Sequence, residues 1–241
     1  MREAGRITGE ALLVARDHIR EGVSTKELDT VIRRHIERCG AKPSFLGLYG
    51  FPGSACISIN DEVIHGIPSE KRILREGDIV KIDVGAFYKG YHGDSARTFP
   101  VGRVSEEAAA LIAATKQSFY EAVKAVKLGN RIGDIGAAVD SYIRSQGFSV
   151  VRKYVGHGIG RDVHEQPDVP NFGTPGRGPR LCEGIVLAIE PMVNCGTYEV
   201  KEAPDGWTVK TADGRLSAHY ENTVALTADG VINLTEVEIG E

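Results

Sequence analysis

Two stretches of the chain match when one gap is allowed: EGDIVKID at Glu76–Asp83 and EGIVLAIE at Glu183–Glu190. Each stretch consists of Glu-Gly, a nearly continuous apolar run and a terminal carboxylate. Such a run is typical of a strand that is buried on both faces. A His-Gly-Ile triplet precedes each copy, at His65 and at His157. The repeat predicts two related halves that place acidic strand ends at a shared centre.

Helical segments precede each copy of the repeat. Apolar residues spaced among charged ones, together with N-cap and glycine signals, predict helices over residues 4–20, 24–40, 105–129 and 134–146. The second of these helices begins at Ser24, where Glu27 completes a Ser-x-x-Glu capping box. Each half of the chain therefore supplies a pair of helices before its repeated strand.

The remaining segments read as short strands joined by turns. We predict short strands at Ala55–Ile59 and Glu62–His65, a hairpin from Ile79–Phe87 to Tyr91–Phe99, and a second hairpin around residues 204–206. No stretch has the composition of a flexible linker. The pattern predicts an α+β chain that forms a single domain over residues 1–241, with halves at about 1–102 and 103–241.

The composition is that of an ordinary globular protein. The 241 residues are 41% hydrophobic and 26% charged, and the formal net charge is −4. This charge argues against binding to a nucleic-acid backbone, which needs a clustered positive surface. We expect no membrane association, because no apolar run approaches bilayer length and the first residues form no signal-like apolar core. The four cysteines form no Cys-x-x-Cys pair, so we predict reduced thiols in a cytoplasmic protein.

Asp83 and Glu190 end the two repeated strands and need partners there. A charged group in a buried strand is costly unless it is paired or bound to a metal. Lys81 lies two positions before Asp83, so both side chains point to the same side of the strand. A capped strand end or a buried ion pair would also explain either carboxylate taken alone.

Three further residues could complete a metal site. Asp94 lies across the predicted hairpin from Asp83, where antiparallel strands bring such residues close. His157 is flanked by glycines that permit close backbone approach, and Glu221 lies in a predicted strand at Ala218–Val224. Four carboxylates and one imidazole suit a pair of divalent cations. A solvated strand edge for Asp94 and a tight turn for His157 stay open as alternatives.

Six motifs in order resemble those of the metal-dependent pita-bread peptidases, and most closely those of the type I methionine aminopeptidases. They are CISINDEVIHGIP at Cys56–Pro68, DVG at Asp83–Gly85, GDS at Gly93–Ser95, GHGIG and HE within Gly156–Glu165, EPM at Glu190–Met192 and ENT at Glu221–Thr223. The resemblance covers nearly the whole chain. It implies a pita-bread fold, with two pseudo-symmetric helix-and-antiparallel-strand halves around a central dinuclear metal site.

The resemblance also implies a role for each predicted ligand. Asp83 would chelate one divalent ion, Asp94 and Glu221 would bridge both ions, and His157 and Glu190 would hold the other. The ions, of Co, Mn, Fe or Zn, would activate a water for attack on the first peptide carbonyl of the substrate. Glu190 would accept the proton of that water as well as bind metal.

Further residues would line the substrate in such an enzyme. His65 and His164 would contact the scissile amide and the peptide carbonyl. Cys56 would line the pocket for the methionine side chain, where Phe51 and Trp207 are the aromatic candidates. A cleft with sulfur and ring edges suits a flexible thioether.

The resemblance is not complete. The loop at 45–53 and Val163, which stands where the family often carries an aromatic ring, depart from the family pattern. The chain starts close to its first predicted helix, and we expect neither a zinc-binding N-terminal extension nor the long helical insertion of the type II enzymes. Asn60, Glu62 and Ser217 stand where the family can bind a monovalent cation.

The resemblance implies a function: the chain would remove the initiator methionine from nascent proteins, with a preference for a small second residue. Its partner would be the N-terminal methionine of nascent polypeptides; contact with the ribosome is left open, and a monomer is expected. A proline-specific peptidase of the same architecture shares the GHGIG and HE motifs, but the Cys56 motif and the missing N-terminal domain argue against it. A catalytically silent module that binds proteins or histones would have no need for five buried ligands, whose burial is costly.

Overall fold

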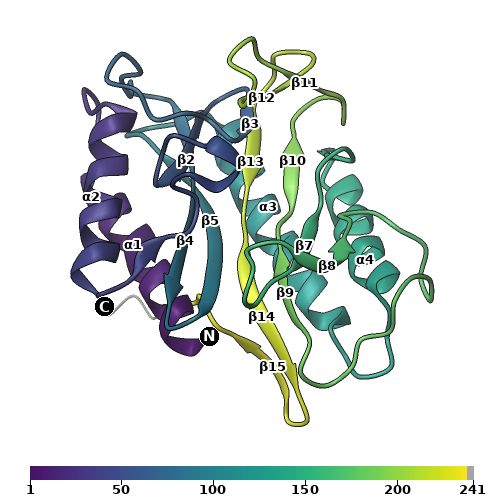
Figure 1. Ribbon diagram of the computed structural model, residues 1–241. Helices are drawn as coiled ribbons and strands as arrows, with labels where there is room; N and C mark the ends of the chain where they lie inside the picture. Colours follow the sequence, from purple (N-terminus) through teal and green to yellow (C-terminus); the bar gives the residue numbers. More distant parts are fainter. Residues whose placement is uncertain (238–241) are drawn as a thin grey trace.

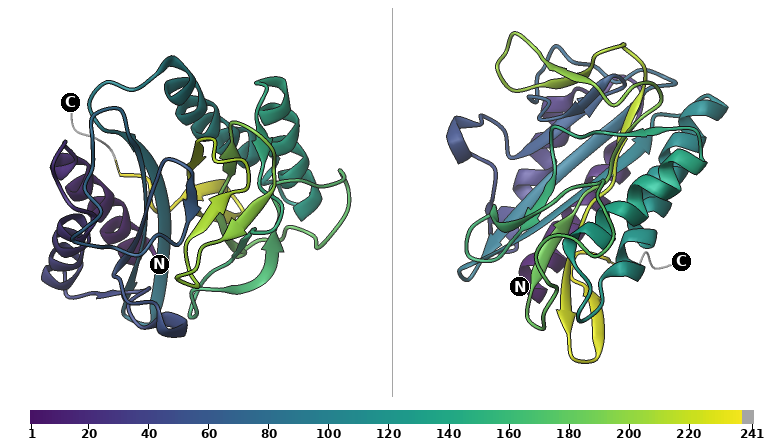
Figure 2. Two further views of the ribbon diagram at one scale, coloured as in Figure 1. Left: turned by 90° about the horizontal axis from the view of Figure 1, so that it is seen from above. Right: turned by 90° about the vertical axis from the view of Figure 1, so that its right-hand side faces the viewer.

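Two pairs of helices flank a central set of strands in the computed structural model, which describes residues 1–237 (Figure 1). Helices α1 (Arg2–His18) and α2 (Thr25–Arg38) lie on one flank, and α3 (Glu106–Ala125) and α4 (Ile132–Ser145) lie on the other. The view from above in Figure 2 shows the strands between the two pairs. Within the described residues, no helix combines the length and apolarity that a membrane crossing requires.

The helix boundaries follow their capping residues. Ser24 caps α2 with the predicted box, in which Ser24 Oγ accepts from Glu27 N and Glu27 Oε2 accepts from Ser24 N. Ser105 caps α3 by accepting from the backbone N–H of Ala108. The prediction that this helix continues to Gly129 is wrong, because the chain leaves helical geometry at Val126. The other predicted helices are confirmed to within two residues at each end.

The first half is a sheet of four strands against α1 and α2. Its strands are β1 (Lys42–Pro43), β2 (Ala55–Ile59), β4 (Ile79–Tyr88) and β5 (Tyr91–Pro100), with β4 paired to the other three. A short 3-10 turn, η1 (Leu48–Gly50), lies in the loop between β1 and β2. The predicted β4–β5 hairpin is confirmed, and its turn residues Lys89 and Gly90 both have positive φ. Ile82, Ile57 and Ile32 belong to the apolar core between this sheet and the helices.

The second half contains three sheets, one of which takes a strand from the first half. Their strand orders are β15-β14-β9-β7-β8, β13-β10-β6 and β11-β12-β3. The bounds are β3 (Glu62–Ile64), β6 (Ser149–Val150), β7 (Gly156–Gly158), β8 (Glu165–Val169), β9 (Val186–Ile189), β10 (Met192–Asn194), β11 (Val200–Glu202), β12 (Val209–Thr211), β13 (Ser217–His219), β14 (Asn222–Thr227) and β15 (Gly230–Asn233). The predicted hairpin around residue 205 is the β11–β12 pair.

Two adjacent strands break at the same level in this half. The predicted continuous strand at Ala218–Val224 is wrong, because β13 ends at His219 and β14 begins at Asn222. The neighbouring strand breaks at Glu190-Pro191, where proline has no N–H to donate to a ladder. Since β9 pairs with β14 and β10 pairs with β13, both breaks lie where the polypeptide passes from one of these sheets to the other. Each break contains one of the predicted ligands.

A short backbone seam joins the two halves. Ala96 of β5 and Glu221 exchange two backbone hydrogen bonds, of 2.9 and 3.3 Å. On one side of this pair, the Thr98 hydroxyl accepts from the N–H of His219 and donates to its carbonyl. On the other side, the Thr223 hydroxyl accepts from the N–H of Asp94 and donates to its carbonyl. Each threonine side chain thus replaces a backbone group, and the seam fixes Asp94 beside Glu221.

Candidate metal centre

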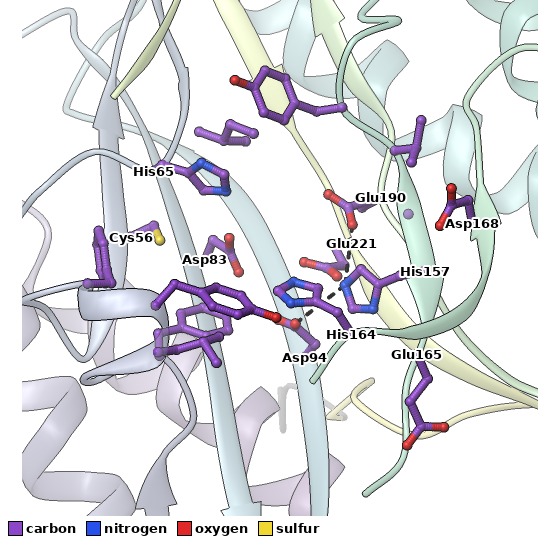
Figure 3. Close-up of a pocket in the computed structure, with 18 of the residues that line it drawn as sticks. Cys56, His65, Asp83, Asp94, His157, His164, Glu165, Asp168, Glu190 and Glu221 are labelled. Atoms are coloured by element: carbon purple, nitrogen blue, oxygen red, sulfur yellow. Dashed lines mark ion pairs between the residues drawn. The ribbon is translucent and has the colours of Figure 1, made fainter. Parts of the chain in front are cut away.

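A cavity of about 450 Å³ lies between the halves, and all five predicted ligands line it (Figure 3). Asp83 and Asp94 come from β4 and β5, where Asp94 pairs with Gly85, two residues beyond Asp83. This offset places both carboxylates on the same face of the hairpin. His157 comes from β7, and Glu190 and Glu221 come from the two strand breaks.

The ligand atoms lie close together. One ligand atom each of Asp94, His157 and Glu221 lies within 4.8 Å of the others. His157 Nε2 lies 3.8 Å from Asp94 Oδ2 and 3.6 Å from Glu190 Oε1. In the view of Figure 3, Asp83 lies on one side of the cluster, and His157 and Glu190 lie on the other, with Asp94 and Glu221 between them.

The tautomer of His157 follows from its backbone contact. Its Nδ1 lies 2.9 Å from the carbonyl oxygen of Gly158, which can only accept a hydrogen bond. Nδ1 therefore carries the proton, and Nε2 presents its lone pair to the carboxylates. Burial lowers the pKa of His157 to about 4, which keeps the ring neutral at neutral pH. A neutral imidazole fixed in this way is the form that binds a metal ion.

The carboxylates carry an electrostatic cost that a cation would remove. Burial raises the pKa of Asp83, Glu190 and Glu221 well above their ordinary values, and the charges of the neighbouring carboxylates add to the effect. Burial also raises the pKa of Asp94 to about 7. Asp83 Oδ1 and Asp94 Oδ1 are enclosed and have no hydrogen-bond partner among the described residues. Unpartnered carboxylate oxygens beside a neutral imidazole fit divalent cations.

His65 and His164 line the same cavity. His65 follows β3 with a φ of +59°, and its ring meets that of Tyr154 edge-on. The His164 ring lies 4.5 Å from that of His157, measured between centroids. Burial lowers the pKa of His65 to about 4, and it also lowers the pKa of His164. Both rings are therefore neutral at neutral pH, and each can donate one hydrogen bond into the cavity.

An apolar pocket adjoins the carboxylate cluster. Cys56 and Phe51 are buried there with Phe45 and Val163, and Trp207 packs against this group. The rings of Phe51 and Trp207 meet edge-on at 5.1 Å between centroids. Burial, followed by the charge of Asp83, raises the pKa of the Cys56 thiol well above its ordinary value, so Cys56 lines the pocket as a neutral group. Val163 packs within this apolar cluster, although it lacks the ring that the family pattern favours.

Sequence reasoning missed three residues near the site. The fully buried His219 places Nε2 3.6 Å from Glu190 Oε2. Its position two residues before Glu221 could have suggested that both share one strand face. Tyr154 contacts His65, and the exposed Tyr49 stacks on His164 at 6.0 Å between centroids. Both tyrosines lie in loops, where no periodicity indicates a direction.

Of the three residues predicted to bind a monovalent cation, two lie together and the third makes other contacts. The backbone carbonyls of Asn60 and Ser217 both accept hydrogen bonds from Lys81 Nζ, at 2.7 and 3.0 Å. Glu62 instead accepts from the backbone N–H of Ile59 and pairs with Arg72. The charged group of Lys81 thus lies against the oxygens that the resemblance assigned to a free ion.

An antiparallel scaffold that gathers five metal-fitting side chains beside an apolar pocket defines a metal-dependent hydrolase. The model of metallopeptidase family M24 matches residues 1–228, and the chain belongs to this family. Methionine aminopeptidases are among its relatives. That of Clostridium perfringens is 55% identical over 99% of this chain and 95% of its own length, and methionine aminopeptidase 1 of Bacillus subtilis is 50% identical over 98% and 95%.

Solved structures agree with this placement. The methionine aminopeptidase of Thermotoga maritima superposes with a TM-score of 0.97 at 41% identity, covering 98% of this chain and 95% of its own. The prolidase of Pyrococcus furiosus superposes with a TM-score of 0.80 at 26% identity, but only 63% of that chain is covered. The fold is therefore the pita-bread fold that both kinds of peptidase share, and the three methionine aminopeptidases named above match this chain over nearly their full length.

Proposed function

We propose that this chain removes N-terminal methionine from peptides and nascent proteins by metal-dependent hydrolysis, with a preference for a small second residue. One observation carries the proposal: the apolar pocket around Cys56, Phe51 and Trp207 opens directly beside the carboxylate cluster. A methionine side chain in this pocket places its own amine and its first peptide bond over the cluster. The thioether is suited to a pocket of sulfur and ring edges.

Asp83, Asp94, His157, Glu190 and Glu221 would hold divalent cations in this centre. Such cations, when bound, polarise the scissile carbonyl and lower the pKa of the attacking water. We propose two ions, because five ligands are spread over two sides of the cluster with Asp94 and Glu221 between them. The ligand chemistry is compatible with Mn, Fe, Co or Zn, and availability in the cell would select among them.

The remaining steps belong to side chains of the protein. Glu190 accepts the proton of the attacking water at a carboxylate oxygen, since its side chain lines the cavity beside the other proposed ligands. Neutral His65 and His164 each donate a hydrogen bond to the peptide carbonyl or to the leaving amide. The negative cluster attracts the substrate ammonium, which favours cleavage one residue from the N-terminus.

Hydrolysis of two tripeptides tests the proposal. Protein stripped of metal is assayed on Met-Ala-Ser and Ala-Pro-Ser, before and after addition of Mn or Co. We expect metal-restored release of methionine from the first peptide alone. Cleavage of the proline peptide alone would move the chain to the prolyl peptidases, and failure on both peptides with bound metal would refute the assigned pocket.

Two further features belong to this proposal. We propose that the chain acts as a monomer, since one copy supplies all five ligands and the whole apolar pocket. Nascent polypeptides would be its natural substrates, and any contact with the ribosome would lie outside the cavity described here. Size-exclusion chromatography with light scattering tests the first point: a dimer that persists at low micromolar concentration would contradict it.

A further inference from the structure

Lys81 is among the largest side chains that are fully enclosed in the described part of the chain, and the proposed reaction does not use it. It lies in the middle of β4 and is 1% exposed. Its Nζ donates to the carbonyl oxygens of Asn60 and Ser217, which are its hydrogen-bond partners within residues 1–237. A buried ammonium is costly unless its environment replaces its hydration. The groups that surround the ammonium group therefore indicate the role of Lys81.

The first carbonyl, that of Asn60, is oriented by a turn that several hydrogen bonds hold in place. Asn60 joins β2 to β3 with a φ of +54°. Its side chain donates to Asp78 Oδ1 at 2.7 Å and accepts from the backbone N–H of Ile79 at 3.0 Å. Its backbone N–H donates to the carbonyl of Ile79. Three hydrogen bonds thus hold Asn60 in a left-handed conformation that an asparagine tolerates, and none of the three uses the carbonyl oxygen that accepts from Lys81.

The second carbonyl comes from the other half of the molecule. Ser217 lies in β13, its N–H donates to the same Asn60 carbonyl at 3.1 Å, and its hydroxyl donates to the carbonyl of Val193. Lys81 Nζ therefore lies at a junction of β4, the β2–β3 turn and β13. Asp83 follows two residues after Lys81, and Glu221 follows four residues after Ser217. The contact links the two strands that lead to these proposed ligands.

The charges around the junction favour a cation there. The carboxylates of Glu62, Asp61 and Asp78 act on Lys81 in this direction, and Arg72 acts against it. Backbone carbonyls are the oxygen ligands that proteins offer to unhydrated potassium ions. An ammonium group carries the same charge as such an ion and has a similar radius.

We propose that the Lys81 ammonium is a tethered monovalent cation. It fills an oxygen site between the halves that would otherwise take a potassium or sodium ion from solution, and it positions the strands that carry Asp83 and Glu221. The proposal does not depend on peptidase activity. It predicts that the melting temperature of the wild-type chain does not depend on which monovalent cation the buffer contains. Loss of the Lys81 side chain should make the melting temperature depend on that cation.

Cation rescue of Lys81→Ala tests this directly. Melting temperatures of metal-stripped protein are compared in KCl, NaCl, NH4Cl and choline chloride at equal ionic strength. In choline, the variant should melt below the wild type. A small cation at about 100 times its Kd should raise the Tm of the variant by roughly 5–10 °C, with saturation. The wild type should melt at the same temperature in all four salts.

Two controls separate a cation site from a general salt effect. Lys81→Met keeps the apolar stem, leaves no room for an ion and should not respond to the choice of salt. Lys210→Ala removes a lysine that pairs with Asp61 near the same turn, and it too should not distinguish potassium from choline. Equal melting of Lys81→Ala in potassium and in choline would overturn the proposal.

A crystallographic measurement tests the proposal even if the alanine variant does not fold. Wild-type crystals are grown with rubidium or thallium, whose anomalous signals locate them. Absence of such an ion between the carbonyls of Asn60 and Ser217, with Lys81 Nζ in its place, supports the proposal. An anomalous peak within contact of both carbonyls in the wild type would show that the lysine does not replace the ion.

Discussion

Asp83 and Asp94 each keep one enclosed oxygen without a hydrogen-bond donor among the described residues. An unsatisfied buried polar atom costs about 1–3 kcal/mol, and more when it is charged. His157 Nε2 lies close to Asp94 and Glu190 but presents a lone pair and donates no hydrogen bond to them. These carboxylates therefore reduce the free energy of unfolding of the metal-free chain, and binding of divalent cations would offset that cost.

Glu221→Gln should prevent metal binding at the centre while preserving the shape of the side chain. The amide has nearly the volume of the carboxylate but lacks its charge, and Glu221 lies between the two sides of the cluster (Figure 3). We expect peptidase activity to fall by about 100-fold or more, because changes to groups that merely support ligands already cost about 10–100-fold. Metal content after dialysis against Mn, measured by mass spectrometry, should fall in parallel.

The matched control is Glu202→Gln, which alters an exposed glutamate paired with Lys153. It should retain both metal and activity. Full metal content together with wild-type turnover in Glu221→Gln would refute the bridging role.

Trp207→Ala should weaken binding of methionine rather than slow its cleavage. The indole meets Phe51 edge-on, and such aromatic pairs are worth about 0.5–1.5 kcal/mol beyond the area they bury. Loss of this wall should raise KM for Met-Ala-Ser by about 10-fold with a smaller change in kcat. Tyr198→Ala, an exposed aromatic outside the cavity, provides the control. An unchanged KM would place the methionine side chain elsewhere.

Among the structural elements, the seam at β5 is held by two threonine hydroxyls as well as by backbone groups. Thr223→Val replaces the hydroxyl by a methyl group of similar size and leaves the N–H and carbonyl of Asp94 without this partner. Each buried group left unpaired costs about 1–3 kcal/mol. We expect the free energy of unfolding, measured in urea, to fall by about 2–4 kcal/mol.

Thr227→Val is the matched control for the seam. It makes the same substitution at a hydroxyl that bonds the Gly230 carbonyl in the exposed β14–β15 hairpin. Its effect should stay within about 0.5 kcal/mol. Equal effects of both substitutions would mean that the seam does not depend on the Thr223 hydroxyl.

The sequence predicts elements well where local chemistry decides them. The capping box at Ser24 and Glu27 and the turn at Lys89-Gly90 are confirmed because their contacts join residues close in sequence. The strand break at Tyr220-Glu221 was missed, because no local signal marks it and only the pairing with β9 and β10 reveals it. The five proposed ligands were found through motifs, whereas His219 was missed because its proximity to Glu190 depends on that same break.

For the whole molecule, divalent cations should stabilise the fold more strongly at high pH than at low pH. Protons compete with cations for carboxylates whose pKa is raised in the folded chain. For Asp94, the folded pKa of about 7 lies above the unfolded value of 3.8. Its stabilising contribution in the metal-free protein is therefore complete below pH 4 and is lost as pH rises through 7.

Thermal unfolding between pH 5 and pH 8 measures this coupling. The metal-free protein should lose stability as pH rises across that range, and a cation at about 100 times its Kd should restore about 2.7 kcal/mol at pH 8. At pH 5 the same cation concentration should have a smaller effect. A larger stabilisation at pH 5 than at pH 8 would contradict carboxylate ligation.

The division of the proposed ligands between the halves has a consequence for how the protein is made. Asp83 and Asp94 precede the connection at residues 101–105, and His157, Glu190 and Glu221 follow it. A chain that is still emerging from synthesis lacks its last ligand until residue 221 has been added and β13 has met β5. A half-made copy therefore has no working centre. On the proposed function, hydrolytic activity therefore requires the finished fold, in which the centre and the substrate pocket form together.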